Sequence, residues 1–410
     1  MSKQLLRVAI VGGGAAGFFS AIACAEANPE ASVHLYETSN HLLAKVRISG
    51  GGRCNATHAC FEPRELAKRY PRGSRELIGP FSRFGPRQTI EWFAARGVEL
   101  KAEADGRMFP TTDDSATIVD CLTEAAAKAG VRVQLRCGVR AAQRRDDAGF
   151  RLELTDGSHV DADRLLLATG GTKGSGGYEL AASLGHTIEP PVPSLFTFMT
   201  VDPRLAGLEG LAVPQATASI PGTRLSETGP VLVTHWGLSG PAILRLSAWG
   251  ARELATRTYR FTLNIAWTGE TPPARVADDL QDWRARNPRK QIGGSHPFDV
   301  PSRLWERLVA ASGITAATPW TSVSNAALKT LTNHLTVGAY AIDGKSTNKD
   351  EFVTCGGVRL SEVNFQTLQS RLCPGLAFAG EVLDIDGITG GFNFQAAWTT
   401  AWIAGQSLAL

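Results

Sequence analysis

The sequence lacks the features that mark several broad classes of protein. Its seven cysteines are scattered over 410 residues, with no C-x-x-C pair and no grouping of cysteine with histidine. This spacing argues against a zinc site and a disulfide framework, and it favours a reducing compartment. No apolar run reaches the ~18 residues that a membrane-spanning helix needs. We therefore expect no metal and no membrane partner.

A strong charge of one sign is also lacking. Lys and Arg number 42 against 39 for Asp and Glu, and this mildly basic balance does not by itself indicate a nucleic-acid partner. The chain enters a strand-like segment almost at once, so we expect no secretion signal and a cytoplasmic location. The length suggests two or three domains.

The first forty residues carry a specific pattern. Arg7–Val11 is predicted as a buried strand, and Gly12, Gly14 and Gly17 form G-x-G-x-x-G at the start of a helix predicted over Ala15–Ala27. Gly12 permits a tight turn, Gly14 leaves room for a pyrophosphate, and Gly17 lets helix and strand pack closely. The free N–H groups at the helix start can hold an anion. The pattern predicts a dinucleotide-binding unit.

A carboxylate ends the next predicted strand. The apolar segment Val33–Tyr36 is followed by Glu37, twenty residues after Gly17. At this spacing a carboxylate can bind the hydroxyls of an adenosine ribose. These features fit NAD and FAD equally well, so the choice between them depends on the rest of the chain.

The end of the chain favours FAD. Leu376–Ala379 is predicted as a strand that leads into Gly380 and Glu381, and the pair Gly390-Gly391 precedes an Ala- and Trp-rich helix. In FAD domains a carboxylate after this strand holds the ribityl hydroxyls. The last helix points its N-terminus at the pyrimidine end of the flavin, where it favours negative charge on the reduced ring. No flavin-linking motif is recognisable, so we expect noncovalent FAD.

Proline residues mark a domain boundary near Pro190–Pro193. Residues 194–350 are predicted to form an inserted substrate domain, barrel-like in its β part and helical over about 270–333. The FAD-binding domain is then made of residues 1–193 and 351–410. No second full dinucleotide fingerprint follows Gly171, so an NAD(P)H donor would visit the flavin only transiently.

Three side chains are candidates for a catalytic proton donor. The segment Ser49–Asn55 contains three consecutive glycines that can lie against a flat ligand, together with Arg53 and Cys54. Arg53 can pair with a phosphate or carboxylate, and a thiol with a pKa of ~8.5 can supply a proton at neutral pH. Cys355, beside Gly356, is one rival. His235 is another, because imidazole titrates near pH ~6.5. A structural role stays open for both Cys54 and His235.

Basic and aromatic residues alternate in the segment Pro63–Gln88. The cations are Arg64, Lys68, Arg69, Arg72, Arg75, Arg83 and Arg87, and the aromatics are Tyr70, Phe81 and Phe84. Such a segment could follow a phosphate backbone and stack on a base. A solvated helix face is the simpler interpretation. A second basic group surrounds Trp283 in the insertion.

Together these motifs resemble the YhiN/BaiN-like bacterial FAD-dependent oxidoreductases, which include aminoacetone-oxidase-like flavoproteins. The matching segments are Val11–Gly17, Ser49–Asn55, Ala168–Gly171, Thr234–Pro241, Gly356–Val358, Gly380–Asp386 and Gly390–Gln395. The resemblance implies an α/β fold, with a two-part, glutathione-reductase-like Rossmann FAD domain and a barrel-like and helical insertion. Where the family often has Gly-Arg-Lys, only Lys45 matches, and Thr172–Gly177 is shorter than in many members.

The resemblance also implies a set of FAD contacts. They are Gly12, Gly14, Ala15, Ala16, Gly17, Glu37, Thr38, Lys45, Ser49, Gly50, Gly51, Gly52, Arg53, Cys54, Asn55, Val139, Ala168, Thr169, Gly170, Gly380, Glu381, Asp386, Gly390, Gly391, Phe392, Asn393 and Phe394. Family members reduce activated C=C bonds, in a uracil of large-subunit ribosomal RNA or in a steroid thioester, and others oxidise aminoacetone. We expect a C=C reductase that uses NAD(P)H, with a uracil of ribosomal RNA or its precursor as leading substrate. An oxidase of a small amine and a non-catalytic, FAD-stabilised RNA-binding factor are the alternatives.

Overall fold

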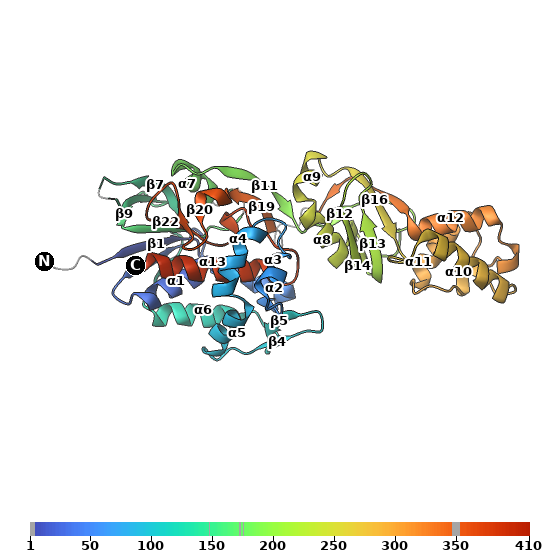
Figure 1. The fold of residues 1–410 in the computed structure, drawn as a ribbon, viewed down its shortest axis with the longest axis horizontal. Coiled ribbons are helices and arrows are strands. Elements are labelled where there is room, and N and C mark those ends of the chain that lie inside the picture. Colours follow the sequence, from blue (N-terminus) through green and yellow to red (C-terminus); the bar gives the residue numbers. More distant parts are fainter. Residues whose placement is uncertain (1–4, 147, 172–173, 175, 347–352) are drawn as a thin grey trace. The chain divides into compact units, whose positions relative to one another are not determined.

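The computed structural model describes residues 5–146, 148–171, 174, 176–346 and 353–410 (Figure 1). The chain divides into two compact units. Unit 1 comprises Met1–Pro193 and Lys349–Leu410, and unit 2 comprises Ser194–Asn348. The predicted end of the insertion, at residue 350, and much of the short segment Thr172–Gly177 lie outside the described residues.

A mainly parallel sheet forms the centre of unit 1. Its strand order is β20-β21-β22-β10-β1-β2-β6. The strands are β1 (Arg7–Val11), β2 (Ser32–Tyr36), β6 (Arg132–Gln134), β10 (Arg164–Leu167), β20 (Val363–Asn364), β21 (Gln369–Ser370) and β22 (Leu376–Phe378). Strands β1, β10 and β22 are almost wholly apolar and buried, as strands covered on both faces require.

The two ends of the chain meet in unit 1. Helix α1 (Ala15–Ala27) packs against the C-terminal helix α13 (Phe392–Leu408), and Figure 1 shows the two side by side. Gly405 permits this approach, because a Cβ atom there would lie 2.5 Å from the carbonyl oxygen of Ser20. The C-terminal helix therefore completes the nucleotide-binding fold that the N-terminal residues begin.

The remaining elements of unit 1 surround this centre. The helices are α2 (Ala44–Gly52), α3 (Pro63–Ala67), α4 (Ser74–Arg83), α5 (Pro86–Ala94), α6 (Ala116–Lys128) and α7 (Gly177–Ser183). One small sheet contains β3 (Thr57–His58), β4 (Leu100–Ala102) and β5 (Arg107–Pro110), and another contains β7 (Val139–Arg144), β8 (Phe150–Leu154) and β9 (His159–Ala162). The prolines at 190, 191 and 193 lie within β11 (Ile188–Ser194), which pairs only with β19 (Val353–Val358) among the named strands. A two-stranded ladder tolerates their missing N–H groups.

Unit 2 begins as an antiparallel sheet of order β17-β16-β13-β14-β15-β12-β18. Its strands are β12 (Phe198–Met199), β13 (Ala212–Ser219), β14 (Ser226–Thr234), β15 (Gly237–Ser239), β16 (Phe261–Ala266), β17 (Gly338–Ile342) and β18 (Gly344–Lys345). The edge strands β17 and β18 are joined by the single residue Asp343, so the chain passes directly from one edge of the sheet to the other, as in a barrel.

Helices complete unit 2. Beside the sheet lie α8 (Pro241–Trp249) and α9 (Ala251–Thr256), and the helical part contains α10 (Pro273–Arg286), α11 (Ser302–Ala311) and α12 (Asn325–Thr336). Trp305 and Trp320 are fully buried in this helical part. Within the described ranges, no helix has the length and apolar character to cross a membrane, and no cluster of metal-binding side chains occurs.

Candidate functional site

The predicted FAD residues gather at one edge of the parallel sheet. Strands β2, β1, β10 and β22 run parallel, so their carboxyl ends lie at the same edge. Each of these strands leads into a predicted FAD residue: β2 into Glu37, β1 into Gly12, β10 into Ala168 and β22, three residues later, into Glu381. This edge is where sheets of this kind bind nucleotides.

The glycine turn after β1 has the geometry that a pyrophosphate requires. Gly12 has a φ of +112°, and a Cβ there would lie 2.4 Å from the carbonyl oxygen of Ala168. A Cβ on Gly17 would lie 1.8 Å from the carbonyl oxygen of Gly12. At Gly14 the space is open, because none of the described atoms lies within 4 Å of a Cβ placed there. The first N–H groups of α1 thus face a gap with room for an anion.

Glu37 is fixed beside this turn. Its Oε2 accepts a hydrogen bond from the N–H of Gly13 at 2.7 Å, and its Oε1 accepts from the N–H of Ser39 at 2.7 Å. Thr38 lies next to β7, since a Cβ on Gly138, the residue before Val139, would lie 2.4 Å from the Thr38 hydroxyl oxygen. Glu37 and Thr38 therefore lie beside the glycine turn at the carboxyl end of β2, and their contact with an adenosine ribose stays a prediction.

The triple-glycine segment is more structured than a surface loop. It belongs to α2, which is interrupted where Ser49 is extended and Gly50 and Gly51 adopt positive φ values of 59° and 70°. Among the described atoms, none lies within 4 Å of a Cβ placed on Gly51 or Gly52. This stretch of backbone is open on one side, as contact with a flat ligand would require.

Cys54 lies beneath this backbone rather than on it. The side chain is fully buried, and burial raises the pKa of the thiol to about 12, although a hydrogen bond with Ser49 acts in the opposite direction. Such a thiol is a poor acid at neutral pH. The structure therefore argues against Cys54 as proton donor and favours its role as a small packed residue.

Carboxylates of unit 1 already neutralise Arg53. Its guanidinium lies 2.7 Å from Glu103 and 3.4 Å from Asp113, and it stacks 3.9 Å above the ring centroid of Phe109. The side chain therefore braces β4 and β5 against the glycine segment. Binding of a ligand's phosphate or carboxylate by Arg53 stays a prediction, and such a ligand would compete with Glu103 and Asp113.

Two other predicted residues meet in an ion pair. The Nζ of Lys45 lies 2.7 Å from Oε2 of Glu381, whose Oε1 accepts from the N–H of Thr354 at 2.8 Å. Nearby, the hydroxyl of Thr169 is buried and has no hydrogen-bond partner in the part of the chain that the structure describes. A buried polar atom without a partner fits a site whose ligand would supply one.

The start of α13 lies against the Ser49–Asn55 segment. With the amide of Asn55 oriented to satisfy both of its ends, its oxygen accepts from the N–H of Gly391 at 3.0 Å. The amide of Asn393 exchanges two hydrogen bonds with Gly387, at 2.8 and 2.9 Å. Phe394 stacks on Trp398 within the helix. The two segments predicted to face the flavin, Ser49–Asn55 and the start of α13, are therefore in contact.

Asp386 and Arg72 occupy a place that the sequence did not suggest. Their side chains form a bidentate ion pair in which Asp386 is fully buried and Arg72 is 11% exposed. The prediction that Arg72 faces solvent with the other cations of its segment is wrong, because Asp386 draws it inward. Asp386 is also predicted to bind the ribityl chain of FAD. In the structure both of its carboxylate oxygens already accept hydrogen bonds from Arg72.

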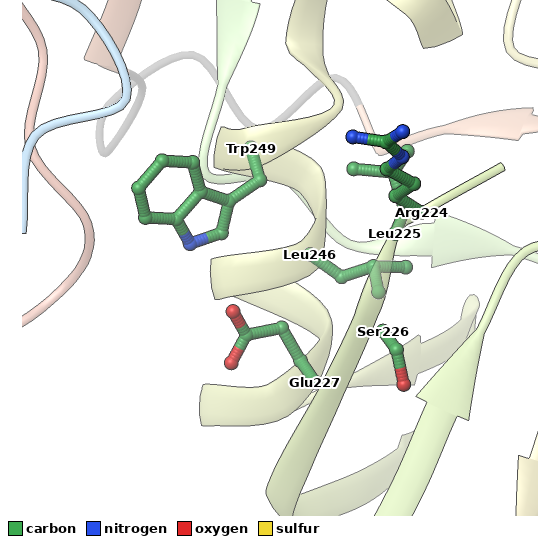
Figure 2. Close-up of a pocket in the computed structure, with 6 residues that line it drawn as sticks. All are labelled: Arg224, Leu225, Ser226, Glu227, Leu246 and Trp249. Atoms are coloured by element: carbon green, nitrogen blue, oxygen red, sulfur yellow. The ribbon is translucent and has the colours of Figure 1, made fainter.

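Unit 2 contains a further catalytic candidate and a separate hollow. His235 is exposed on the turn between β14 and β15 and remains a prediction. Figure 2 shows residues that line the hollow, which lies between the indole of Trp249 and residues 224–227, where β14 begins. Its volume is about 330 Å³. The carboxylate of Glu227 is already paired with Arg245 at 2.8 Å. Among the described residues, those that line the hollow include no histidine or cysteine, so the hollow offers none of the predicted proton donors.

Comparison with known proteins agrees with the geometry. The HI0933-like protein Rossmann domain family matches residues 6–407. A ribosomal RNA dihydrouridine synthase of Escherichia coli is 31% identical, over 97% of each chain. A 3-dehydro-bile acid delta(4,6)-reductase of Clostridium scindens is 30% identical, over 98% of this chain and 99% of that protein.

Solved structures show the same fold. The 3-ketosteroid-delta4-(5alpha)-dehydrogenase of Rhodococcus jostii, in complex with 4-androstene-3,17-dione, aligns with a TM-score of 0.51 at 15% identity, covering 100% of this chain and 98% of that one. The predicted Rossmann-type FAD-binding fold and the predicted cofactor, FAD, are confirmed. The open space at Gly14 and the unpartnered Thr169 hydroxyl fit this cofactor. The chain belongs to the HI0933-like Rossmann-domain family, and it is an FAD-dependent oxidoreductase.

Proposed function

We propose that the protein reduces a C=C bond with NAD(P)H as donor, and that its substrate is a uracil base of large-subunit ribosomal RNA or its precursor. The observation that carries this proposal is a cationic surface beside the flavin-facing segments. We call it the α3–α5 cationic face. It consists of the exposed side chains Arg64, Lys68, Arg69, Arg75, Arg83 and Arg87.

The α3–α5 cationic face suits a polyanion better than a small molecule. Residues 63–88 contain only two acids, Glu65 and Glu76, and one of them pairs with Lys68. Phe61 is 44% exposed, and the guanidinium of Arg87 lies 5.1 Å from the centroid of its ring. Cations can bind phosphates, and an exposed aromatic ring can stack on an unpaired base.

This face is tied to the flavin end of unit 1. The carbonyl of Arg69 accepts a hydrogen bond from the N–H of Ile388 at 2.9 Å, just before the glycines that begin α13. This contact supports the proposal that an RNA on the face would bring its bases close to the loop that precedes α13. A uracil in a helix would have to leave its stack to react, as substrates of base-modifying enzymes do.

The chain supplies position and charge for the reaction. Bound FAD would supply hydride transfer from a reduced nicotinamide to one carbon of the double bond. The first N–H groups of α13 favour negative charge next to them. A proton must reach the other carbon, and burial argues against Cys54 as its source. His235 is then the candidate donor that the sequence motifs leave.

A steroid-like enone is the second candidate substrate. The bile acid reductase is almost as similar to this chain as the dihydrouridine synthase of E. coli, with 30% against 31% identity. A steroid has no phosphate backbone and would not need the α3–α5 cationic face. An amine oxidase that uses O₂ would not need that face either.

The test is a comparison of ribosomal RNA from a deletion strain and its parent by mass spectrometry. We expect one dihydrouridine to be missing after deletion and to return with the wild-type gene. A variant with Arg69, Arg75 and Arg87 changed to Gln should restore less of it. A variant with Arg252, Arg257 and Arg260 of unit 2 changed to Gln serves as the charge-matched control, because these side chains are exposed or, for Arg257, partly exposed, and lie outside both basic groups. If the deletion leaves every dihydrouridine in place, the proposal is wrong.

A further inference from the structure

A tyrosine and a buried ion pair join residues 69–73 to the loop before α13. The hydroxyl of Tyr70 donates to the carbonyl of Phe392 at 2.6 Å. Two residues on, Arg72 binds both carboxylate oxygens of Asp386, and the backbones of these two residues also pair as an isolated antiparallel bridge. The residues joined by these contacts are 322 and 314 positions apart in the sequence.

The two segments are in contact along their backbones. Tyr70 is 1% exposed and Asp386 is fully buried. A Cβ on Gly73 would lie 2.6 Å from the side chain of Ile385, and a Cβ on Gly387 would lie 3.1 Å from the ring of Tyr70. Because these contacts leave no room for an added methyl group, the two segments are closely packed. The loop before α13 therefore cannot shift without moving residues 69–73.

The loop that is held in this way presents the start of α13. On one side Asn55 accepts from the N–H of Gly391, and on the other side Tyr70 donates to the carbonyl of Phe392. Gly391, the N-cap residue, adopts a positive φ of 88° and has no side chain of its own to cap the helix. The electrostatic influence of a helix end is confined to its first turn, so its effect on a ligand depends on where that turn is held.

We propose that Tyr70, Arg72 and Asp386 are positioning residues for the flavin. They fix the first turn of α13, which faces the bound cofactor, and Asp386 acts through Arg72 and the loop rather than as a direct ligand of the ribityl chain. This role belongs to the FAD site and does not depend on the identity of the substrate.

Tyr70→Phe tests the proposal with little change in packing. The matched control is Tyr340→Phe in unit 2, since the Tyr340 hydroxyl is also buried and has one hydrogen bond, from Trp267 at 2.9 Å. We expect both variants to bind FAD. Tyr70→Phe should lower the reduction potential of the flavin, with an about fivefold change in the equilibrium between oxidised and reduced forms, the equivalent of one hydrogen bond. Tyr340→Phe should leave it unchanged. Equal potentials in the wild type and both variants would overturn the proposal.

The ion pair is tested by Arg72→Met, Asp386→Asn and the double variant, with FAD affinity and flavin potential as readouts. Both single variants should change these properties, and the double variant should show less than the sum of their effects, because the residues act as one unit. Release of FAD by Asp386→Asn, together with a wild-type affinity and potential for Arg72→Met, would make Asp386 a direct ligand and overturn the proposal. If the charge variants do not fold, the potential of Tyr70→Phe decides the question.

Discussion

Gly14→Ala separates cofactor binding from folding more cleanly than other changes in the glycine turn. Within the described residues, nothing lies within 4 Å of the new Cβ, and Gly14 is at φ −88°, which alanine adopts readily. Alanine lowers the conformational entropy of the unfolded chain, which stabilises the fold, but it is a poorer N-cap residue than glycine, which destabilises it. Each effect is less than about 1 kcal/mol. The apoprotein should therefore unfold close to the wild-type temperature.

The same methyl group should weaken FAD binding strongly. Gly14 is the position at which the backbone must approach the pyrophosphate, so the methyl displaces charge-assisted hydrogen bonds from the N–H groups of α1. Loss of two such bonds weakens FAD binding by about 100-fold, taking ~1.5 kcal/mol for each. Calorimetric unfolding of the apoprotein and FAD titration measure the two effects. Gly17→Ala is the contrasting variant, because its Cβ would lie 1.8 Å from the carbonyl oxygen of Gly12 and should destabilise the fold itself. Wild-type FAD affinity in Gly14→Ala would refute the placement of the pyrophosphate.

Three further outcomes are expected. Glu37→Ala should weaken FAD binding by ~1–3 kcal/mol in a titration, because it removes the carboxylate placed at the ribose, and full affinity would count against that placement. Cys54→Ala should leave the reoxidation of reduced flavin by substrate at its normal rate in stopped-flow, since the thiol is buried; slow reoxidation with normal FAD content would restore its role as proton donor. Changing Arg69, Arg75 and Arg87 to Gln should make the plot of log K for RNA binding against log salt concentration shallower by about 2, since each lost contact with a single-strand phosphate removes ~0.7 from the slope. An unchanged slope would mean that the α3–α5 cationic face is only a solvated surface.

The parts of the fold that follow local rules were predictable from the sequence. The helix Ala15–Ala27 and the strand Arg7–Val11 have the predicted bounds, because steric limits at the glycines and apolar periodicity act over a few residues. The start of α13 follows the same logic, with Gly391 at a positive φ that other residues rarely adopt.

Long-range pairing of charges was beyond the sequence. Arg72 looked like one cation among seven, and only the folded chain brings it to Asp386, 314 residues away. Arg53 likewise finds Glu103 and Asp113 only when the small sheet of β3, β4 and β5 folds beside the glycine segment. The burial of Cys54 had the same origin, since its neighbours in sequence are glycine, arginine and asparagine. In each case tertiary packing decides what a reactive side chain faces.

The most direct test of the proposed activity is a single turnover in the absence of oxygen. The protein, with its FAD reduced by NADPH and excess donor removed, is mixed with a large-subunit ribosomal RNA transcript, and flavin absorbance and the mass of each uridine are followed. The proposed function predicts that the flavin is reoxidised at the rate at which one uridine gains two hydrogens. Reoxidation by a steroid enone, with no change in the RNA, would contradict the assignment of the substrate to RNA.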